Sequence, residues 1–440
     1  MRRHLFESRI KIFLVIATFV MTILRFLLNE KGRATPDSIR FMRTANVFPE
    51  IDNTTTPLGY PLSLKLFTFL GLDEFWSSKV VGILAYLFIV FFARAKKFYF
   101  KETVLICGLF SFVSIFSYTV SEALILPFVF LFLYISRQII IDSWPFWKSV
   151  LLLSLSLISL YSIRYSALFF VGAVFLFGLI QFRKKYGKIF LISAGIGILY
   201  IVLYKFLFID RFNSNYINEF LEIGVKPTSQ MITEFFAGIT TTFNPFIHIS
   251  NPNGGMMNIG IFGIGALNIV LMAYIFIKNK LSENEKFIVF TGVAGIICSF
   301  FIQYFYSMDA LDYRLLAPFS FPVWLVYFKK IYQILGKYTY GITVLSLITG
   351  LIFTALSSGN YLENRKEISR FLEQENLKKA PLKFYIQNPE NLDNVQITEL
   401  ISTVNPNIKL TFKPNDTLQK TTLTTHKVLK KVKIDTNKFQ

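Results

Sequence analysis

Apolar residues in this chain are laid out in long blocks, most of them near the roughly 20 residues that a helix needs to cross a bilayer. The blocks predict about eleven transmembrane helices near 10–28, 75–93, 103–117, 120–136, 148–162, 165–181, 188–208, 256–277, 286–305, 314–328 and 337–356. Several blocks are short for a full crossing, so the pairs 103–117 with 120–136 and 148–162 with 165–181 could instead be broken or re-entrant helices. The pattern predicts an all-α, multi-span membrane protein that begins with an uncleaved first helix.

The connections between these blocks alternate in charge. Five of them are basic, namely MRRHLFESRIK, RAKKFYFK, FRKKYGK, KNKLSENEK and KKIYQILGK, whereas those between them are nearly free of Lys. By the positive-inside rule the basic set and the N-terminus are cytoplasmic. The outer face then receives residues 29–74, the turns near Ser121 and Arg164, the loop 209–255 and the loop YSMDALDYR. Because the predicted number of spans is odd, the C-terminal tail also lies outside.

Four stretches of the chain outside the spans have a pattern of their own. PDSIRFMRTA and YPLSLKLFTFLG have helical spacing but are too short to span, which predicts amphipathic helices on the membrane surface. NPFIHISNPNGG is rich in Asn, Pro and Gly and predicts an irregular loop. After about residue 358 the chain becomes polar and Lys-rich, with strand-like runs such as NIKLTF and HKVLKKVKI. We therefore predict a transmembrane domain over 1–357 and a small α/β domain over 358–440.

Composition agrees with a membrane protein, since 53% of residues are hydrophobic and only 17% are charged. The 46 Lys and Arg against 27 Asp and Glu give a net charge of +19, but the basic residues punctuate the apolar blocks and form no continuous face. This distribution fits membrane topology and argues against nucleic-acid binding. Cys107 and Cys298 both lie inside apolar blocks and the three His are scattered, so neither a disulfide framework nor a metal cage is predicted.

Ionisable residues avoid the centres of the predicted spans, which argues against an ion-coupled transporter. Several fall instead at one membrane face, namely Asp37, Glu122, Arg164, Asp309, Asp312 and Arg314. Guanidiniums bind phosphate oxygens bidentately, and a carboxylate can accept the proton of an attacking hydroxyl, so this set suits group transfer from a lipid phosphate. Structural roles are the alternatives: Asp37 as a helix N-cap, Glu122 as a complement to a helix dipole, and Arg164 as a snorkelling side chain.

The order of these residues follows a pattern. An acidic residue opens a surface helix, an aromatic residue follows four positions on and a small residue four further, before Gly-Tyr-Pro; the matching residues are Asp37, Phe41, Ala45, Gly59, Tyr60 and Pro61. Ser121 and Glu122 open the fourth span, Arg164 lies at a tight outer turn, and Arg314 precedes an apolar pair and Pro318. Over most of residues 1–356 the chain resembles the C-type membrane glycosyltransferases, the polyprenyl-phosphate-sugar-dependent group that includes protein O-mannosyltransferases and aminoarabinose transferases. The tail from about 360 matches no family.

The resemblance implies a dozen or so transmembrane helices and a catalytic carboxylate in the first outer loop, which maps to Asp37. It also implies a sugar donor linked to polyprenyl phosphate and a lipid, protein or glycan acceptor at the outer face. Two residues depart from the family pattern. Ser38 stands where many members have a second acidic residue. No cofactor is therefore predicted with certainty, and the use of a divalent metal ion stays an open alternative. Phe41 stands where a Tyr is usual.

We therefore expect Asp37 to act as the base of an inverting single displacement. Arg164 or Arg314 would hold the donor phosphate, with Arg40 and Arg43 as further candidates. Glu122, Tyr60, Asp309 and Asp312 would position the substrate, although the two Asp residues could equally solvate their turn. Two other classes stay open: a transporter, flippase or scaffold for a lipid-linked glycan, and a polysaccharide polymerase. Polymerases place their Arg residues in two long late loops, whereas the recognisable pattern here comes early.

Overall fold

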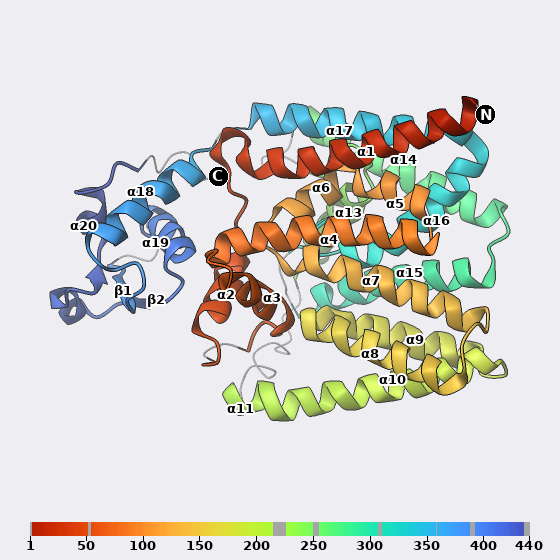
Figure 1. The fold of residues 1–440 in the computed structure, drawn as a ribbon, viewed down its shortest axis with the longest axis horizontal. Helices are drawn as coiled ribbons and strands as arrows, with labels where there is room; N and C mark the ends of the chain where they lie inside the picture. The colour runs from red at the N-terminus through yellow and green to blue at the C-terminus, as the bar shows by residue number, and fades with distance from the viewer. Residues whose placement is uncertain are drawn as a thin grey trace.

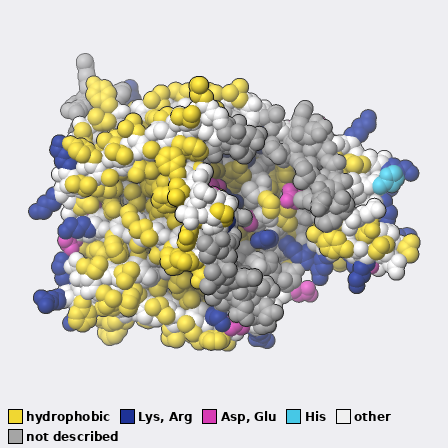
Figure 2. Space-filling view, turned by 180° about the vertical axis from the view of Figure 1, so that it is seen from behind, with side chains coloured by type: hydrophobic (Ala, Val, Ile, Leu, Met, Phe, Trp, Pro, Cys, Tyr) yellow, Lys and Arg dark blue, Asp and Glu magenta, His cyan; other side chains and the backbone are white. Residues whose placement is uncertain are grey.

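The computed structural model describes residues 2–51, 54–213, 226–249, 255–306, 310–357, 359–387 and 392–434. Long helices lie roughly parallel in a bundle, with the helices α2 (Pro36–Val47) and α3 (Gly59–Thr68) and the C-terminal domain at one end of it (Figure 1). We refer to this end as the Asp37 end. The surface of the bundle is largely hydrophobic, and many of the charged side chains gather at its ends and on the C-terminal domain (Figure 2).

Every apolar block of the sequence is helical. The helices of the bundle are α1 (Arg2–Leu27), α4 (Glu74–Lys96), α5 (Phe100–Cys107), α6 (Phe110–Ser117), α7 (Ser121–Ile140), α8 (Phe146–Ile163), α9 (Leu168–Ile180), α10 (Lys185–Tyr204), α14 (Met256–Lys278), α15 (Glu283–Phe305), α16 (Ala317–Leu335) and α17 (Thr339–Leu356). Shorter elements connect them: η1 (Leu28–Glu30), η2 (Tyr165–Ala167), η3 (Lys205–Ile209), α11 (Asp210–Phe212), α13 (Thr228–Thr242) and η4 (Gly336–Tyr338). Helix α13 lies in the long loop 209–255, where the sequence predicted no helix.

Within the described ranges, eight helical stretches are long and apolar enough to cross a membrane, or nine if α5 and α6, which meet at 75°, form one span. The predicted count of eleven is not confirmed by this measure. One reason is that the block near 165–181 forms only the shorter apolar helix Tyr165–Ile180. The other is that Ala317–Leu356 counts as one stretch although it contains both α16 and α17, which meet at Gly336 with a φ of +55°.

Helix α4 packs closely against the end of α6. A Cβ atom added at Gly82 would lie 2.1 Å from the Phe116 carbonyl oxygen, so only glycine permits this approach. Small residues at helix contacts allow such backbone proximity inside membranes. The packing fixes the first turns of α4 relative to the corner between α6 and α7.

The two short amphipathic stretches form α2 and α3, as predicted. Helix α2 begins at Pro36 with Thr35 as its N-cap, and the Ser38 hydroxyl accepts a hydrogen bond from the Thr35 backbone N–H at 2.8 Å. Asp37 therefore lies in the first turn of α2 and is not its cap. Its side chain is left available for other contacts.

The C-terminal domain is a small α/β unit, in agreement with its strand-like runs. Its elements are α18 (Tyr361–Gln374), β1 (Leu382–Tyr385), α19 (Leu392–Val404), β2 (Ile408–Thr411), η5 (Pro414–Leu418), β3 (Thr422–Leu423) and α20 (Thr425–Leu429). The sheet has the order β2-β1-β3, and β1 runs parallel to both neighbours, with Leu382 opposite Ile408 and Lys383 opposite Thr422. The run HKVLKKVKI was wrongly predicted as a strand. It begins in α20, because the Thr424 side chain caps that helix by accepting from the Lys427 backbone N–H at 3.1 Å.

A hydrophobic core joins the C-terminal domain to the surface helices. Phe41, Tyr60 and Phe75 belong to the same buried cluster as Phe384 and Leu400. Polar contacts reinforce this interface. The Arg43 guanidinium donates to the carbonyl oxygens of Pro406 at 3.2 Å and Ile408 at 2.6 Å, and Arg365 lies 2.6 Å from the Asp73 carboxylate. The C-terminal domain thus packs directly on the helix that carries Asp37.

Candidate functional site

Asp37 projects from the first turn of α2 with 46% of its side chain exposed. One carboxylate oxygen lies 3.2 Å from Nη2 of Arg314, and the other lies 4.0 Å from Nη1 of Arg40 one helical turn away. Arg40 is itself 58% exposed. Asp37 is therefore a carboxylate that an external molecule can reach, with a much more buried guanidinium behind it.

Glu122 is the buried centre of the site, with 4% of its side chain exposed. It lies in the first turn of α7, where a carboxylate also complements the helix dipole. The carboxylate oxygen Oε1 accepts from Arg164 at 2.7 Å and lies 3.5 Å from Nε of Arg314. One carboxylate thereby holds two guanidiniums from different loops side by side.

The Arg314 guanidinium joins the two carboxylates. Burial lowers its pKa, but the carboxylates of Glu122, Asp312 and Asp37 together raise that pKa above the ordinary value. The group is therefore charged at any physiological pH. It also donates a long hydrogen bond of 3.5 Å to the Thr35 hydroxyl, beside Asp37.

Arg164 ends α8 in an extended conformation, with φ of −155° and ψ of 128°. Its Nε donates to the Ser166 hydroxyl at 2.8 Å, which fixes the side chain while Nη1 binds Glu122. The next residue, Tyr165, donates from its hydroxyl to the Thr54 carbonyl oxygen at 2.9 Å. The turn is thus tied to the first outer segment, and Arg164 is a member of the site, not a snorkelling side chain.

The structure brings together Asp37, Glu122, Arg164 and Arg314, with Arg40 at the rim. On the face shown in Figure 2, acidic and basic side chains are visible in a hollow between the bundle and the C-terminal domain. These residues lie far apart in the sequence. Their meeting point is therefore a product of the tertiary fold.

Tyr60 lies behind the site and has no solvent exposure. Its ring packs edge-on against Phe41, with centroids 4.9 Å apart. Burial raises the pKa of Tyr60, and the nearby Glu122 carboxylate raises it further. The hydroxyl is buried without a hydrogen-bond partner among the described residues. Tyr60 and Phe41 form a hydrophobic support between α2 and α3, and the Tyr60 side chain is closed off from solvent.

Two other residues predicted for the site, Arg43 and Asp312, make their hydrogen bonds outside the ion pairs of Glu122. Arg43 binds the backbone of the C-terminal domain, so its guanidinium is committed to that interface. Asp312 accepts from the Leu315 backbone N–H at 2.9 Å and so stabilises its own turn. Burial raises the pKa of the Asp312 carboxyl despite the neighbouring Arg314 guanidinium. Asp309 lies outside the described residues.

The structure also reveals polar residues that the sequence did not single out. Thr35 and Ser166 bind the two guanidiniums, as described above. Lys79, in α4, donates to the carbonyl oxygens of Arg33 and Ser117, which precede Asp37 and Glu122 in the chain by four and five residues. The signal for Lys79 was its place as a single lysine in the apolar run WSSKVVGILAYL. Thr35 and Ser166 had no comparable signal.

An apolar groove of about 260 Å³ opens beside the site between α3, α4 and α7. Its lining residues are Ser63, Phe67, Val81, Leu84, Ala85, Phe88, Leu124, Pro127, Phe128 and Leu131. Leu124 lies two residues after Glu122, and Ser63 lies one turn after Tyr60. The groove therefore shares α3 and α7 with the residues at the site.

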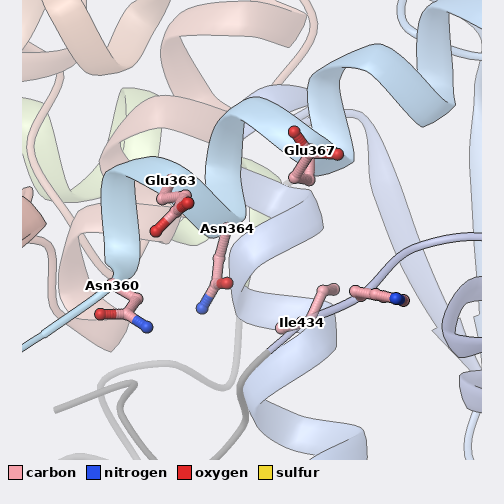
Figure 3. Close-up of a pocket in the computed structure, with 6 residues that line it drawn as sticks. Asn360, Glu363, Asn364, Glu367 and Ile434 are labelled. Carbon is pink, nitrogen blue, oxygen red and sulfur yellow. The ribbon is translucent and has the colours of Figure 1, made fainter.

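A larger cavity of about 470 Å³ lies elsewhere, on the C-terminal domain. Figure 3 shows the polar side chains of Asn360, Glu363, Asn364 and Glu367 along α18, with Ile434 opposite them. None of the guanidiniums that bind Glu122 lines it. In the described part of the chain, no group of three or more His, Cys, Asp or Glu side chains is arranged to hold a metal ion.

No protein-family model and no curated protein sequence matches the chain. Among solved structures, the fold is similar to the crystal structure of ArnT from Cupriavidus metallidurans bound to undecaprenyl phosphate, with a TM-score of 0.54, 10% sequence identity, and 94% of this chain and 90% of that chain covered. The apo crystal structure of the same ArnT matches with a TM-score of 0.47 and 11% identity, over 94% of this chain and 87% of that one. The similarity to the undecaprenyl-phosphate-bound structure confirms the fold expected from the resemblance to C-type membrane glycosyltransferases.

Proposed function

We propose that this protein transfers a sugar from a polyprenyl-phosphate-linked donor to an acceptor hydroxyl at the membrane face where the Asp37 end lies. The observation that carries this proposal is the position of Arg314, which contacts both the exposed Asp37 and the buried Glu122. A carboxylate that an acceptor can reach stands beside two guanidiniums suited to phosphate. By the positive-inside rule this face is extracytoplasmic.

The donor lipid fits the groove between α3, α4 and α7. A polyprenyl chain would bury its methyl-branched surface against the apolar lining, and in this proposal its phosphate binds Arg164 and Arg314. Paired guanidiniums bind phosphate oxygens in a planar, bidentate manner. The structural neighbour ArnT was crystallised with undecaprenyl phosphate, which supports a ligand of this class.

In the proposed step, the acceptor oxygen attacks the anomeric carbon and the bond from that carbon to the phosphate oxygen breaks. The hydroxyl proton passes to the Asp37 carboxylate, and the bonding electron pair leaves with the phosphate. One displacement of this kind inverts the anomeric centre. The leaving polyprenyl phosphate gains a negative charge, which Arg164 and Arg314 stabilise because they are already held in place by Glu122.

The test is a transfer assay with the purified full chain in lipid nanodiscs. Synthetic short-chain polyprenyl phosphates that carry different hexoses and pentoses are offered with lipid, peptide and glycan hydroxyl acceptors, and release of free polyprenyl phosphate is measured. We expect turnover with at least one donor, an inverted anomeric configuration in the product, and no turnover with water-soluble nucleotide sugars.

Failure of every donor, together with protein-dependent movement of a fluorescent lipid-linked glycan across proteoliposomes, would favour a flippase instead. Growth of long glycan chains on the donor lipid would favour a polymerase. The three classes therefore give three different products from one preparation.

A further inference from the structure

Lys79 is a buried lysine near the start of α4, with 2% of its surface exposed. Its ammonium donates three hydrogen bonds: to the Arg33 carbonyl oxygen at 2.9 Å, to the Ser117 carbonyl oxygen at 3.0 Å, and to the Thr119 hydroxyl at 3.0 Å. An ammonium has three donors, so all of them are used. The side chain is thus fully committed to oxygens of the protein.

The acceptors come from two segments that are separate in the chain. Arg33 lies four residues before Asp37, whereas Ser117 and Thr119 lie just before Glu122. The two segments also bind each other directly. The Thr119 backbone N–H donates to the Arg33 carbonyl oxygen at 3.2 Å, and the Ser38 hydroxyl donates to the Thr119 carbonyl oxygen at 2.7 Å. Lys79 therefore lies where the segment that leads to Asp37 meets the segment that leads to Glu122.

The Lys79 Nζ atom has no carboxylate partner within the described residues. Its ammonium lies 4.8 Å from the ring centre of Phe75 and 5.5 Å from that of Phe26. Burying a polar group is costly unless hydrogen bonds compensate for the lost water, so the three oxygens stabilise a lysine at this position. A role in capping the end of α6 accounts for the Ser117 contact but not for the contact with Arg33.

The backbone at Lys79 is also held rigidly. Gly82, one turn further along α4, lets the helix approach the Phe116 carbonyl oxygen so closely that no other residue fits. The Lys79 Cα is thereby fixed next to the α6–α7 corner. The neighbouring Ser78 hydroxyl adds a contact of 2.6 Å to the Thr119 hydroxyl. Because the backbone at Lys79 is fixed and its Nζ makes three hydrogen bonds, the side chain can hold the two segments at a constant distance from each other.

We infer that Lys79 is a positioning residue that fixes Asp37 relative to Glu122, and through both of them the guanidinium of Arg314. This inference rests on the proposed function for its catalytic consequence, but its structural part does not. Without the ammonium, the carbonyl of Arg33 and the Thr119 hydroxyl lose a shared donor, and α2 gains freedom against α7. Displacement by about 1 Å can lower the rate of a transfer reaction about 100-fold, since reacting groups must be aligned.

The experiment compares Lys79→Met with Lys65→Met in the full chain in nanodiscs. Lys65 is a matched control, because it donates to the Asn46 carbonyl oxygen at 3.2 Å near the C-terminal end of α2, whereas Lys79 donates to the segment just before the N-terminal end. Hydrogen exchange is measured for peptides covering 33–38 and 117–122, together with kcat and KM in the transfer assay. We expect exchange in both peptides to become at least about 10-fold faster in Lys79→Met, with kcat about 10- to 100-fold lower and KM within about 2-fold.

Thr119→Val is a milder second variant that removes one acceptor and keeps the shape of the side chain, in case Lys79→Met does not fold. Unchanged exchange in both Lys79→Met and Thr119→Val would overturn the inference, and so would faster exchange with unchanged kcat. Equal effects in Lys65→Met would also overturn it, because the loss would then be general to α2. If the parent protein transfers no sugar, the proposed function fails, while the exchange data still decide whether Lys79 joins the two segments.

Discussion

The Arg314 guanidinium lies 3.2 Å from the Asp37 carboxylate although the two residues are 277 positions apart in the chain. Arg314 precedes α16 and Asp37 opens α2, so their contact links a late element of the bundle to a surface helix. The pair places a cation that suits phosphate directly beside a carboxylate that suits an acceptor hydroxyl.

Replacing Asp37 with Asn removes the proposed base and nearly preserves its shape. We expect kcat to fall about 100- to 10,000-fold, the range by which general-base catalysis accelerates reactions, with donor binding little changed. The measurement is release of polyprenyl phosphate at saturating donor. Asp142→Asn is the matched control, since that carboxylate is exposed and pairs with Lys185 at the opposite end of the bundle. Normal turnover in Asp37→Asn would exclude this residue as the base.

Replacing Arg314 with Lys keeps the charge and removes the planar fork. Lys cannot contact Asp37, Glu122 and a phosphate at the same time, so we expect kcat/KM for the donor to fall by about 10- to 100-fold. Arg137→Lys serves as the control, because Arg137 lies at the other end of α7 against the ring of Phe98. Equal activity of the two variants would mean that the fork geometry plays no part.

Replacing Glu122 with Gln leaves two guanidiniums without their shared counter-ion. Removing one partner of a buried ion pair typically costs at least about 3 kcal/mol, and both Glu122 and its partners are mostly buried. We expect a clear decrease in the unfolding temperature in detergent as well as loss of transfer. A decrease no larger than that of Glu283→Gln, which removes an exposed pairing with Lys184, would contradict this account.

The stability of the protein should depend on pH through Lys31, whose Nζ donates to the Thr354 carbonyl oxygen at 2.8 Å. Burial, with the nearby Arg33 and Arg25 guanidiniums, lowers the pKa of Lys31 from 10.5 to about 7. Between these two pKa values the unfolded chain holds a proton that the folded chain has released, so the free energy of unfolding rises with pH across this window. Below about pH 7 both states are protonated, and the full cost of burying the charged ammonium lowers the stability.

The test is the unfolding temperature of the parent protein and of Lys31→Met from pH 7 to pH 10. We expect the difference to move in favour of the parent as the pH rises, because the variant lacks the titrating group. Lys185→Met, which removes an exposed lysine, should show no such trend. A constant difference across the window would refute the effect.

Replacing Arg43 with Gln should loosen the C-terminal domain. Its guanidinium binds two backbone carbonyls of that domain, and charged hydrogen bonds contribute about 1.5–3 kcal/mol each. We expect faster proteolysis between residues 359 and 434 and a smaller loss of transfer than in Asp37→Asn. Arg370→Gln is the control within the same domain, since Arg370 pairs with Glu367 on the exposed side of α18. Equal proteolysis of the two variants would show that Arg43 does not hold the domain.

Several features of this protein could be read from local pattern alone. The apolar blocks predicted the helices because a bilayer requires each spanning segment to satisfy its own backbone hydrogen bonds, which is a condition on consecutive residues. The amphipathic spacing of α2 and α3 was recognisable for a similar reason. The positions of Asp37, Glu122, Arg164 and Arg314 in sequence order pointed to the same fold that the comparison with ArnT confirmed.

Other features depended on how distant segments pack. Arg40 and Arg43 lie on the same short helix, yet Arg40 borders the site and Arg43 binds the C-terminal domain, a difference that only the docking of that domain creates. The run HKVLKKVKI has strand-like spacing but was overridden by the cap at Thr424.

The sequence by itself determined that this is a many-helix membrane protein with acidic and basic residues in its loops at one face. Only the tertiary structure decided which of those charges meet, that Glu122 holds two guanidiniums, and that Lys79 joins the segments leading to Asp37 and Glu122. The physical reason is that the length of an apolar segment is a property of consecutive residues. An ion pair, in contrast, joins residues far apart in the sequence and depends on how their helices pack.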